Sequence, residues 1–285
     1  MNEKKTNIAD LQNKKSKGEK IFMLTAYDYP IARFADEAGV DAVLVSDALG
    51  MVGLGYETTT PVTMAEIIHH TKAVVRGAKH SLILATMPFL SYSFSLSESL
   101  KNAGKLIKEG GAGGVEVEGG SEILDTVKAI IDVGIPVMPH IGLTRQYQLR
   151  FGKFKVQGGN ASAAGEILKL ALALQKAGAF AILMECIPDR VARIITEILE
   201  IPTIGIGSGP YCDGQALVSQ DMLGLFEPFL PRFAKRYLNL SEDIRKAFND
   251  FKREVESGKF PALEHCFAIK DEEFEKFKAL IEESK

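Results

Sequence analysis

The sequence has few cysteines, and none of them is spaced for a metal site. Cys186, Cys212 and Cys266 are the three cysteines of the 285 residues, and no two of them form a CxxC pair. An odd number of cysteines without metal spacing fits reduced thiols in a cytoplasm. We therefore expect a cytoplasmic protein in which each cysteine is a small, buried apolar residue.

Long apolar runs and clusters of basic residues are also missing. No stretch reaches the apolar length that a membrane helix needs, and the polar first residues lack the features of a signal peptide. The net charge is −3, and lysines and arginines do not gather beyond helix faces and short tails. Membranes and nucleic acids are therefore not expected as partners.

A further absence concerns nucleotide-binding loops, because neither a GxGxxG motif nor a P-loop opens a helix. The chain does contain eight apolar runs rich in β-branched residues, with helical patterns between most of them. These runs are 21–28, 42–48, 82–87, 114–119, 136–142, 180–186, 202–207 and 215–219.

The alternation of these runs with helices predicts an α/β fold, a (β/α)8 TIM barrel. Continuously apolar strands between helices indicate a parallel sheet that is covered on both faces. Eight strands within roughly 200 residues favour a closed barrel over an open doubly wound sheet. We expect one barrel domain over 1–285, with an N-terminal helix and loop at 1–19 and a helical appendage at about 230–285.

Helix signals between the runs agree with this fold. Thr63 with Glu66, and Ser95 with Glu98, each fit a capping box at the start of a helix. Apolar residues at 191–199 recur at the spacing of one helix face.

Polar residues gather where the apolar runs end, which in such barrels is the side of the active site. In the stretch GGVEVEGG, Glu116 and Glu118 are two positions apart, so both side chains point to the same face of the strand. Two like charges on one buried face are costly unless a positive group lies between them. The candidates at strand ends are Tyr27, Asp28, Asp47, Thr86, Glu116, Glu118, His140 and Glu185.

These residue types suggest a divalent cation beside a general base. Asp47, Glu116 and Glu118 offer the oxygen ligands that Mg²⁺ prefers, although any one of them could instead form a salt bridge at the rim. His140 gains weight because it shares the strand-end layer with the carboxylates. Glu185 ends an apolar strand, and we expect burial to raise its pKa toward that of a useful base.

A cation with a base suits proton abstraction beside a carbonyl. The ion would chelate a 2-oxo acid through its carboxylate and keto oxygens and stabilise the developing enolate. The spacing alone does not distinguish an aldolase from a lyase or a mutase.

Between about Gly18 and Ile269 the chain contains an ordered series of short motifs that match a known family. They include LTAYDYPIARFADEAGVD, LGMVGLGYETTTPVTMAEI, MPFLSY, HIGLT, KVQG, MECIP and IPTIGIGSGPYCDGQ. In these blocks the chain resembles the ketopantoate hydroxymethyltransferase family, a member of the phosphoenolpyruvate/pyruvate barrel superfamily.

The resemblance implies transfer of a hydroxymethyl group from 5,10-methylenetetrahydrofolate to 3-methyl-2-oxobutanoate. The product would be 2-dehydropantoate, on the route to pantothenate and coenzyme A, formed with Mg²⁺ through a metal-stabilised enolate. By resemblance, Glu185 is the general base that removes the C3 proton and His140 is a histidine of the site. Asp47 and Glu118 correspond to metal-coordinating carboxylates. The family also implies a homo-oligomer, often a decamer.

The chain departs from the family pattern at the metal and substrate positions. LATMPF has Thr86 where a metal-binding aspartate is expected, and the family's Lys-x-Glu is here Glu116-x-Glu118. We hypothesise that Glu116 partly replaces the missing aspartate, which makes Glu116 and Thr86 additional candidate metal ligands. The family's Gly-Asp-Ser is here Ser-Asp-Ala, so a substrate-binding hydroxyl is lost or has moved one step back. The predicted substrate-binding residues are Ser46, Asp47, Ala48, Thr86 and Glu116.

A competing interpretation concerns the lost lysine. Without it, the substrate carboxylate would need another cation, either Arg145, in LTRQ where the family has LTPQ, or Lys153. The alternative function is therefore a divalent-metal-dependent aldolase or lyase acting on a different 2-oxo acid, and a barrel without catalysis is a third. The folate is expected under the loops that follow the third and sixth strands.

Overall fold

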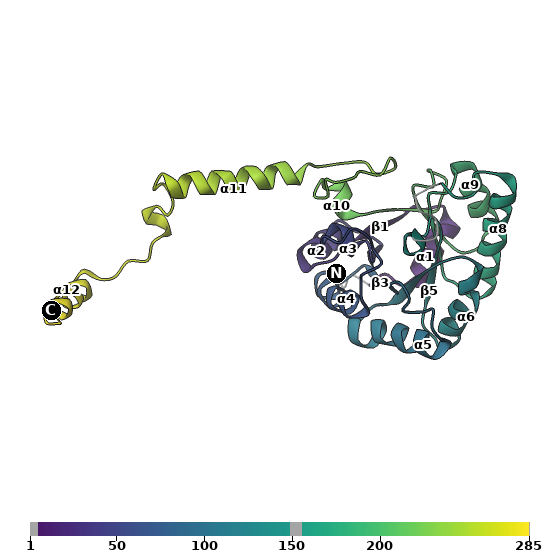
Figure 1. Ribbon diagram of the computed structural model, residues 1–285, viewed down its shortest axis with the longest axis horizontal. Helices are drawn as coiled ribbons and strands as arrows, with labels where there is room; N and C mark the ends of the chain where they lie inside the picture. The colour runs from purple at the N-terminus through teal and green to yellow at the C-terminus, as the bar shows by residue number, and fades with distance from the viewer. Residues whose placement is uncertain (1–4, 149–155, 285) are drawn as a thin grey trace. The chain divides into compact units, whose positions relative to one another are not determined.

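The structure, a computed structural model, describes residues 5–148 and 156–284. Eight parallel strands form a closed barrel in chain order, from β1 beside β2 round to β8 beside β1 (Figure 1). The strands are β1 (Ile21–Thr25), β2 (Ala42–Val45), β3 (Leu82–Thr86), β4 (Gly114–Glu118), β5 (Val137–Gly142), β6 (Ile182–Glu185), β7 (Thr203–Ile206) and β8 (Gly214–Leu217). The prediction of an α/β (β/α)8 TIM barrel is confirmed.

Each predicted run overlaps one strand, but every strand is shorter than its run. The first run shows why, because β1 ends at Thr25 and Asp28 already serves the next helix. The Asp28 carboxylate accepts the Ile31 N–H at 2.8 Å as the N-cap of that helix. Asp28, a candidate site residue by position, is therefore a helix cap.

Helices surround the barrel (Figure 1). They are α1 (Ile8–Lys17), α2 (Tyr29–Glu37), α3 (Leu49–Val52), α4 (Met64–Gly77), α5 (Leu96–Lys105), α6 (Leu124–Asp132), α8 (Ala161–Lys176), α9 (Asp189–Ile198) and α10 (Ser219–Met222), with the π-helix η1 (Leu106–Gly110) and the 3-10 helices η2 (Ser121–Ile123) and η3 (Arg145–Tyr147). Thr63 and Glu66 form the predicted capping box of α4, and Ser95 caps α5 by accepting the Glu98 N–H.

Two apolar cores position the site. The larger lies between the strands and the surrounding helices, and the smaller fills the barrel interior with residues such as Met23, Leu84 and Met138. Leu11 of α1 belongs to this inner core. Lysines of α1 pair with aspartates that precede β2 and β8, so α1 covers the amino-terminal end of the barrel. The carboxyl end is left for the site.

The chain divides into two compact units, Met1–Leu238 with the barrel and Asn239–Lys285. The second unit contains α11 (Leu240–Glu256), η4 (Leu263–His265) and α12 (Asp271–Glu282), which supplies the predicted C-terminal helical extension. Within it, the rings of Phe251 and Phe260 pack edge to face at 5.3 Å. Across residues 5–148 and 156–284, no helix combines the length and apolar character needed to cross a membrane.

Candidate active site

Strand pleating places a layer of polar side chains inside the mouth of the barrel. Leu84, Met138 and Leu183 belong to the inner core, and the side chain two positions later on each strand also points inward. Those later residues are Thr86, His140 and Glu185, all buried at or near the carboxyl ends of their strands. The predicted convergence of polar strand ends is therefore present in the structure.

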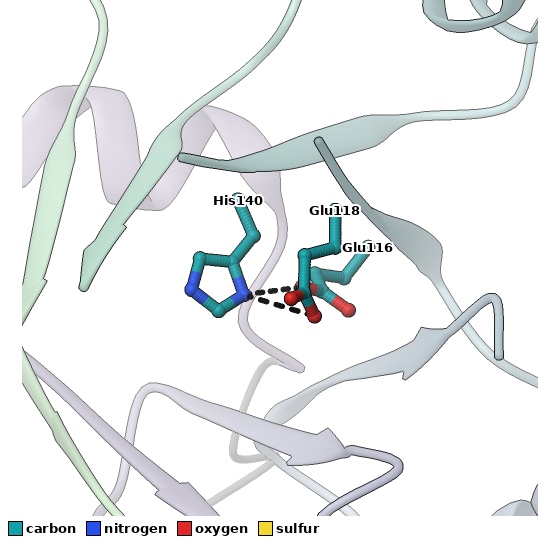
Figure 2. A group of neighbouring side chains, drawn as sticks. All are labelled: Glu116, Glu118 and His140. Carbon is teal, nitrogen blue, oxygen red and sulfur yellow. Dashed lines mark hydrogen bonds and ion pairs between the residues drawn. The ribbon is translucent and has the colours of Figure 1, made fainter. Parts of the chain in front are cut away.

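Glu116 and Glu118 of β4 face His140 of the neighbouring strand β5 (Figure 2). His140 Nδ1 lies 2.9 Å from Glu116 Oε1 and 3.8 Å from Glu118 Oε2. One ligand atom from each residue lies within 4.8 Å of the others. The imidazole is thus the positive group that makes two carboxylates on one buried face tolerable.

The surroundings of His140 favour its protonated form. Burial alone would lower its pKa, but the hydrogen bond with Glu116, the nearby Glu185 carboxylate and the charge of Glu118 raise the pKa well above the usual value. His140 Nε2 lies 3.2 Å from Glu185 Oε2, so the imidazolium links the carboxylates of β4 to that of β6.

Burial and the crowding of carboxylates also raise the pKa values of Asp47 and Glu118. Burial, followed by the charge of Glu116, raises the pKa of Asp47 to about 7. Burial raises the pKa of Glu118 well above its usual value, although His140 and the Gln146 N–H, which donates to Glu118 Oε1 at 3.0 Å, offset part of this. Both carboxyl groups therefore ionise only at a cost that a cation would reduce.

Glu185 carries an ion pair that the sequence analysis did not anticipate. Both Nε and a terminal nitrogen of Arg145 lie 3.1 Å from Glu185 Oε1. Burial would raise the Glu185 pKa, but Arg145 and His140 outweigh it and lower the pKa below the usual value. The prediction of a raised pKa is wrong, because it counted burial without the two cations. Lys153, the other cation considered, lies outside the described residues.

The residues present fit a divalent cation. Asp47 Oδ2, Glu116 Oε2 and Thr86 Oγ1 are buried oxygens without a hydrogen-bond partner among the described residues. Asp47, Glu116, Glu118 and Glu185 face two cationic side chains, so a dication would balance the charge when all four are ionised. Most of the donors are oxygens, which suits a hard ion such as Mg²⁺.

A small inner cavity of about 40 Å³ lies among these groups. Eight of the predicted site residues line it, namely Ser46, Asp47, Ala48, Thr86, Glu116, Glu118, His140 and Glu185, whereas Tyr27 and Asp28 do not. The Ser46 hydroxyl also lies 2.9 Å from Tyr27 Oη. The tight cluster of possible ligands contains Glu116, Glu118 and His140, with Asp47 at the wall of the same cavity.

A larger, mostly apolar cavity of about 580 Å³ opens next to the inner one. Ala48, Arg145, Glu185 and Val218 line both cavities. Much of its remaining wall comes from residues 186–189 after β6 and from residues 226–233 after β8, including Phe226, Phe229 and Phe233. Sequence reasoning missed the second segment, and the aromatic stretch FEPFLPRF was the available signal. No described residue of the loop after β3 lines this cavity.

A second group that sequence reasoning missed holds the loop after β5 in place. Tyr92 Oη lies 2.6 Å from the Glu118 carbonyl oxygen and 2.7 Å from Gln146 Oε1. Gln146 Nε2 donates to the Met87 carbonyl at 3.0 Å. These bonds tie the residue next to Arg145 to the ends of β3 and β4.

Comparison with known sequences finds similar proteins that match most of the chain. The model of the Ketopantoate hydroxymethyltransferase family matches residues 5–263. A 3-methyl-2-oxobutanoate hydroxymethyltransferase of Syntrophomonas wolfei is 52% identical over 268 residues, which cover 94% of this chain and 97% of that one. A protein of the same description from Enterococcus faecalis is 52% identical, covering 95% and 99% of the two chains.

Solved structures resemble the chain in fold. A phosphoenolpyruvate phosphomutase from Streptomyces platensis superposes with a TM-score of 0.58 at 15% identity, covering 98% of both chains. At this identity the likeness shows the barrel fold alone.

Proposed function

The chain belongs to the ketopantoate hydroxymethyltransferase family, and from this premise we propose that it transfers a hydroxymethyl group from 5,10-methylenetetrahydrofolate to 3-methyl-2-oxobutanoate, giving 2-dehydropantoate. The observation that carries the proposal is the barrel mouth, where a buried base, a histidine and three further carboxylates meet in a chain that matches the family over residues 5–263.

Asp47, Glu116 and Glu118 would hold a divalent cation, which we propose is Mg²⁺. When bound, the ion would supply Lewis-acid polarisation of the 2-oxo group. The Thr86 hydroxyl and Ser46 lie at the same cavity and would contact the ion's waters or the substrate.

Glu185 is the proposed base for the C3 proton. Its lowered pKa keeps the carboxylate ionised at neutral pH, which is the form that accepts a proton. His140 and Arg145 hold one carboxylate oxygen each, so the carboxylate has a fixed orientation. His140 also contacts both Glu116 and Glu185. Its cationic imidazole therefore lies near any negative charge that develops on the substrate.

The larger cavity is the proposed place for the folate. Its aromatic and aliphatic wall suits the flat ring system of a pterin, and it joins the inner cavity at Glu185. The sequence placed the folate under the loops after β3 and β6. The proposed site keeps the loop after β6 but has residues 226–233 in place of the loop after β3.

A metal-dependent aldolase or lyase acting on another 2-oxo acid is the second candidate. The observation that favours it is that three residues lining the inner cavity, Glu116, Thr86 and Ala48, depart from the family pattern. One barrel supports many reactions, so altered strand ends can change the substrate.

The experiment incubates the purified protein with Mg²⁺, 5,10-methylenetetrahydrofolate and 3-methyl-2-oxobutanoate and measures 2-dehydropantoate by mass spectrometry. We expect product that depends on both the metal and the folate. No product, together with metal-dependent C3 deuterium exchange on oxaloacetate or pyruvate, would reject the transferase in favour of the second candidate.

The proposal includes assembly into a homo-oligomer in the cytoplasm. Exposed apolar side chains on α11 and α12, such as Phe248, Phe251 and Phe277, support packing against other surfaces. Light scattering on the full chain would test this, and a monomeric mass would reject it.

A further inference from the structure

Arg145 lies at the junction of the inner and outer cavities and lines both of them. It begins η3, directly after the loop that leaves β5. Its neighbour Gln146 is tied to Glu118 and Met87, so the backbone at this point is fixed. Arg145 borders the place where the two cavities adjoin, together with Ala48, Glu185 and Val218.

Without a bound cation, the charge at the inner cavity would repel an acidic substrate. Four carboxyl groups line that cavity, namely Asp47, Glu116, Glu118 and Glu185. Among the described residues that line it, Arg145 is the one lysine or arginine. His140 is the other cation, but Glu116 and Glu185 already flank both of its ring nitrogens. Among the described side chains that line the inner cavity, Arg145 is therefore the one placed to pair with a substrate carboxylate, in addition to the ion.

The guanidinium geometry suits a carboxylate. Nε and a terminal nitrogen of Arg145 both contact a single oxygen, Glu185 Oε1, at 3.1 Å. Two such N–H groups in one plane are the fork that binds the two oxygens of a carboxylate side by side.

Cavity size places the substrate at this fork. The inner cavity of about 40 Å³ has room for only a small number of water molecules, so a branched keto acid cannot lie wholly within it. The substrate must extend into the cavity of about 580 Å³, and it passes Arg145 where the two spaces join.

Resting on the proposed function, we propose that Arg145 binds the carboxylate of the 2-oxo acid substrate, exchanging Glu185 Oε1 for it. Arg145 is thus a substrate-binding residue that selects acids over neutral ketones. The exchange also releases one oxygen of Glu185 from the guanidinium when substrate is present, so that the base is uncovered only beside its substrate.

The test is calorimetric titration with 3-methyl-2-oxobutanoate, and separately with its methyl ester, in the presence of Mg²⁺ and without folate. The variants are Arg145→Gln and Arg145→Lys. The matched control is Arg193→Gln, which removes an arginine from another Arg–Glu ion pair, with Glu197 on the exposed face of α9.

We expect Arg145→Gln to raise the Kd of the acid at least about tenfold, since hydrogen bonds to a charged group are lost. The Kd of the ester should stay within about twofold, and Arg145→Lys should recover part of the loss because it keeps the charge. In steady state, KM for the keto acid should rise more than kcat falls. The control should bind the acid as the unmodified protein does.

An unchanged Kd of the acid in Arg145→Gln, or equal weakening of acid and ester, would overturn the proposal. A purely structural role of Arg145 would weaken both probes alike. If the unmodified protein binds the acid but forms no 2-dehydropantoate, the proposed function fails while these titrations still decide the role of Arg145. Binding of neither 3-methyl-2-oxobutanoate nor pyruvate by the unmodified protein would overturn the inference as well.

Discussion

At the amino-terminal end of the barrel, Leu11 packs against an apolar interior, whereas at the carboxyl end the same strands bury carboxylates, an imidazole and a guanidinium. On β3, the two environments are separated by one strand repeat, from Leu84 to Thr86. The apolar layer stabilises the fold, while the polar layer holds groups such as Asp47, whose pKa near 7 records the cost of burial. Stability and chemistry therefore lie in adjacent layers, and substitutions should separate them.

The largest effect is expected in the polar layer, from Glu185→Gln. Removing the proposed base should slow metal-dependent deuterium exchange at C3 of 3-methyl-2-oxobutanoate about 10²- to 10⁴-fold. The fold and Mg²⁺ binding should stay nearly intact, since Glu185 lies outside the tight ligand cluster. Exchange is followed by NMR and ion binding by calorimetry. Loss of ion binding would mean that Glu185 is a ligand instead, and unchanged exchange with the ion bound would mean that it is not the base.

In the apolar layer, Leu84→Ala should lower the stability of the fold and leave the reaction rate largely unchanged. Leu84 is fully buried in the inner core, so the cavity should lower the free energy of unfolding by about 2–5 kcal/mol. The rate per folded molecule should change little. Chemical denaturation measures the loss, with Leu172→Ala on the outer side of α8 as the control. A large fall in rate at an unchanged stability would break the separation of the two layers.

A smaller effect is expected from Glu116→Gln, which tests whether this residue replaces the missing aspartate. Loss of one negative oxygen donor should weaken Mg²⁺ binding by about tenfold or more, and Thr86→Asp in the same background should restore part of it. Glu197→Gln, on the surface, serves as the control. An unchanged Mg²⁺ affinity in Glu116→Gln would reject the compensation.

The smallest effect concerns pH and the metal-free protein. The pKa of Asp47 is raised to about 7, so between about pH 4 and pH 7 the folded state binds more protons than the unfolded state. Stability should therefore fall as the pH rises through this range, and the raised pKa values of Glu118 and His140 act in the same direction.

Thermal unfolding measures this prediction, with a fall of a few degrees expected from pH 5 to pH 7. Asp47→Asn should flatten the dependence, and Mg²⁺ should restore stability at pH 7 because it binds the ionised folded state. Stability that rises with pH in the metal-free protein would contradict the assignment of buried, crowded carboxylates.

The barrel could be predicted because its signal is local and repeated. Each strand is a short apolar run between helical patterns, and the strand-end rule then selects residues such as Glu118, His140 and Glu185. The exact strand ends were harder to predict. Asp28 could end a strand or cap a helix, and only the backbone conformation shows that it caps a helix.

Contacts between distant segments could not be predicted. Arg145 and Glu185 are 40 residues apart, and their ion pair reverses the direction of the Glu185 pKa. Burial at a strand end is visible in a sequence, but the cation that a separate loop brings to it is not. The aromatic wall at 226–233 was missed for the same reason, because it follows the last strand without a periodic pattern.

The central claim, that the carboxylates of the barrel mouth hold a dication beside a keto acid, is tested most directly by diffraction. Crystals are soaked with Mn²⁺, whose anomalous signal locates the ion, and with 3-methyl-2-oxobutanoate. We expect an anomalous peak in contact with Glu116 or Glu118, with the keto acid next to it. Clear density for the keto acid with no anomalous peak at the strand ends would contradict it.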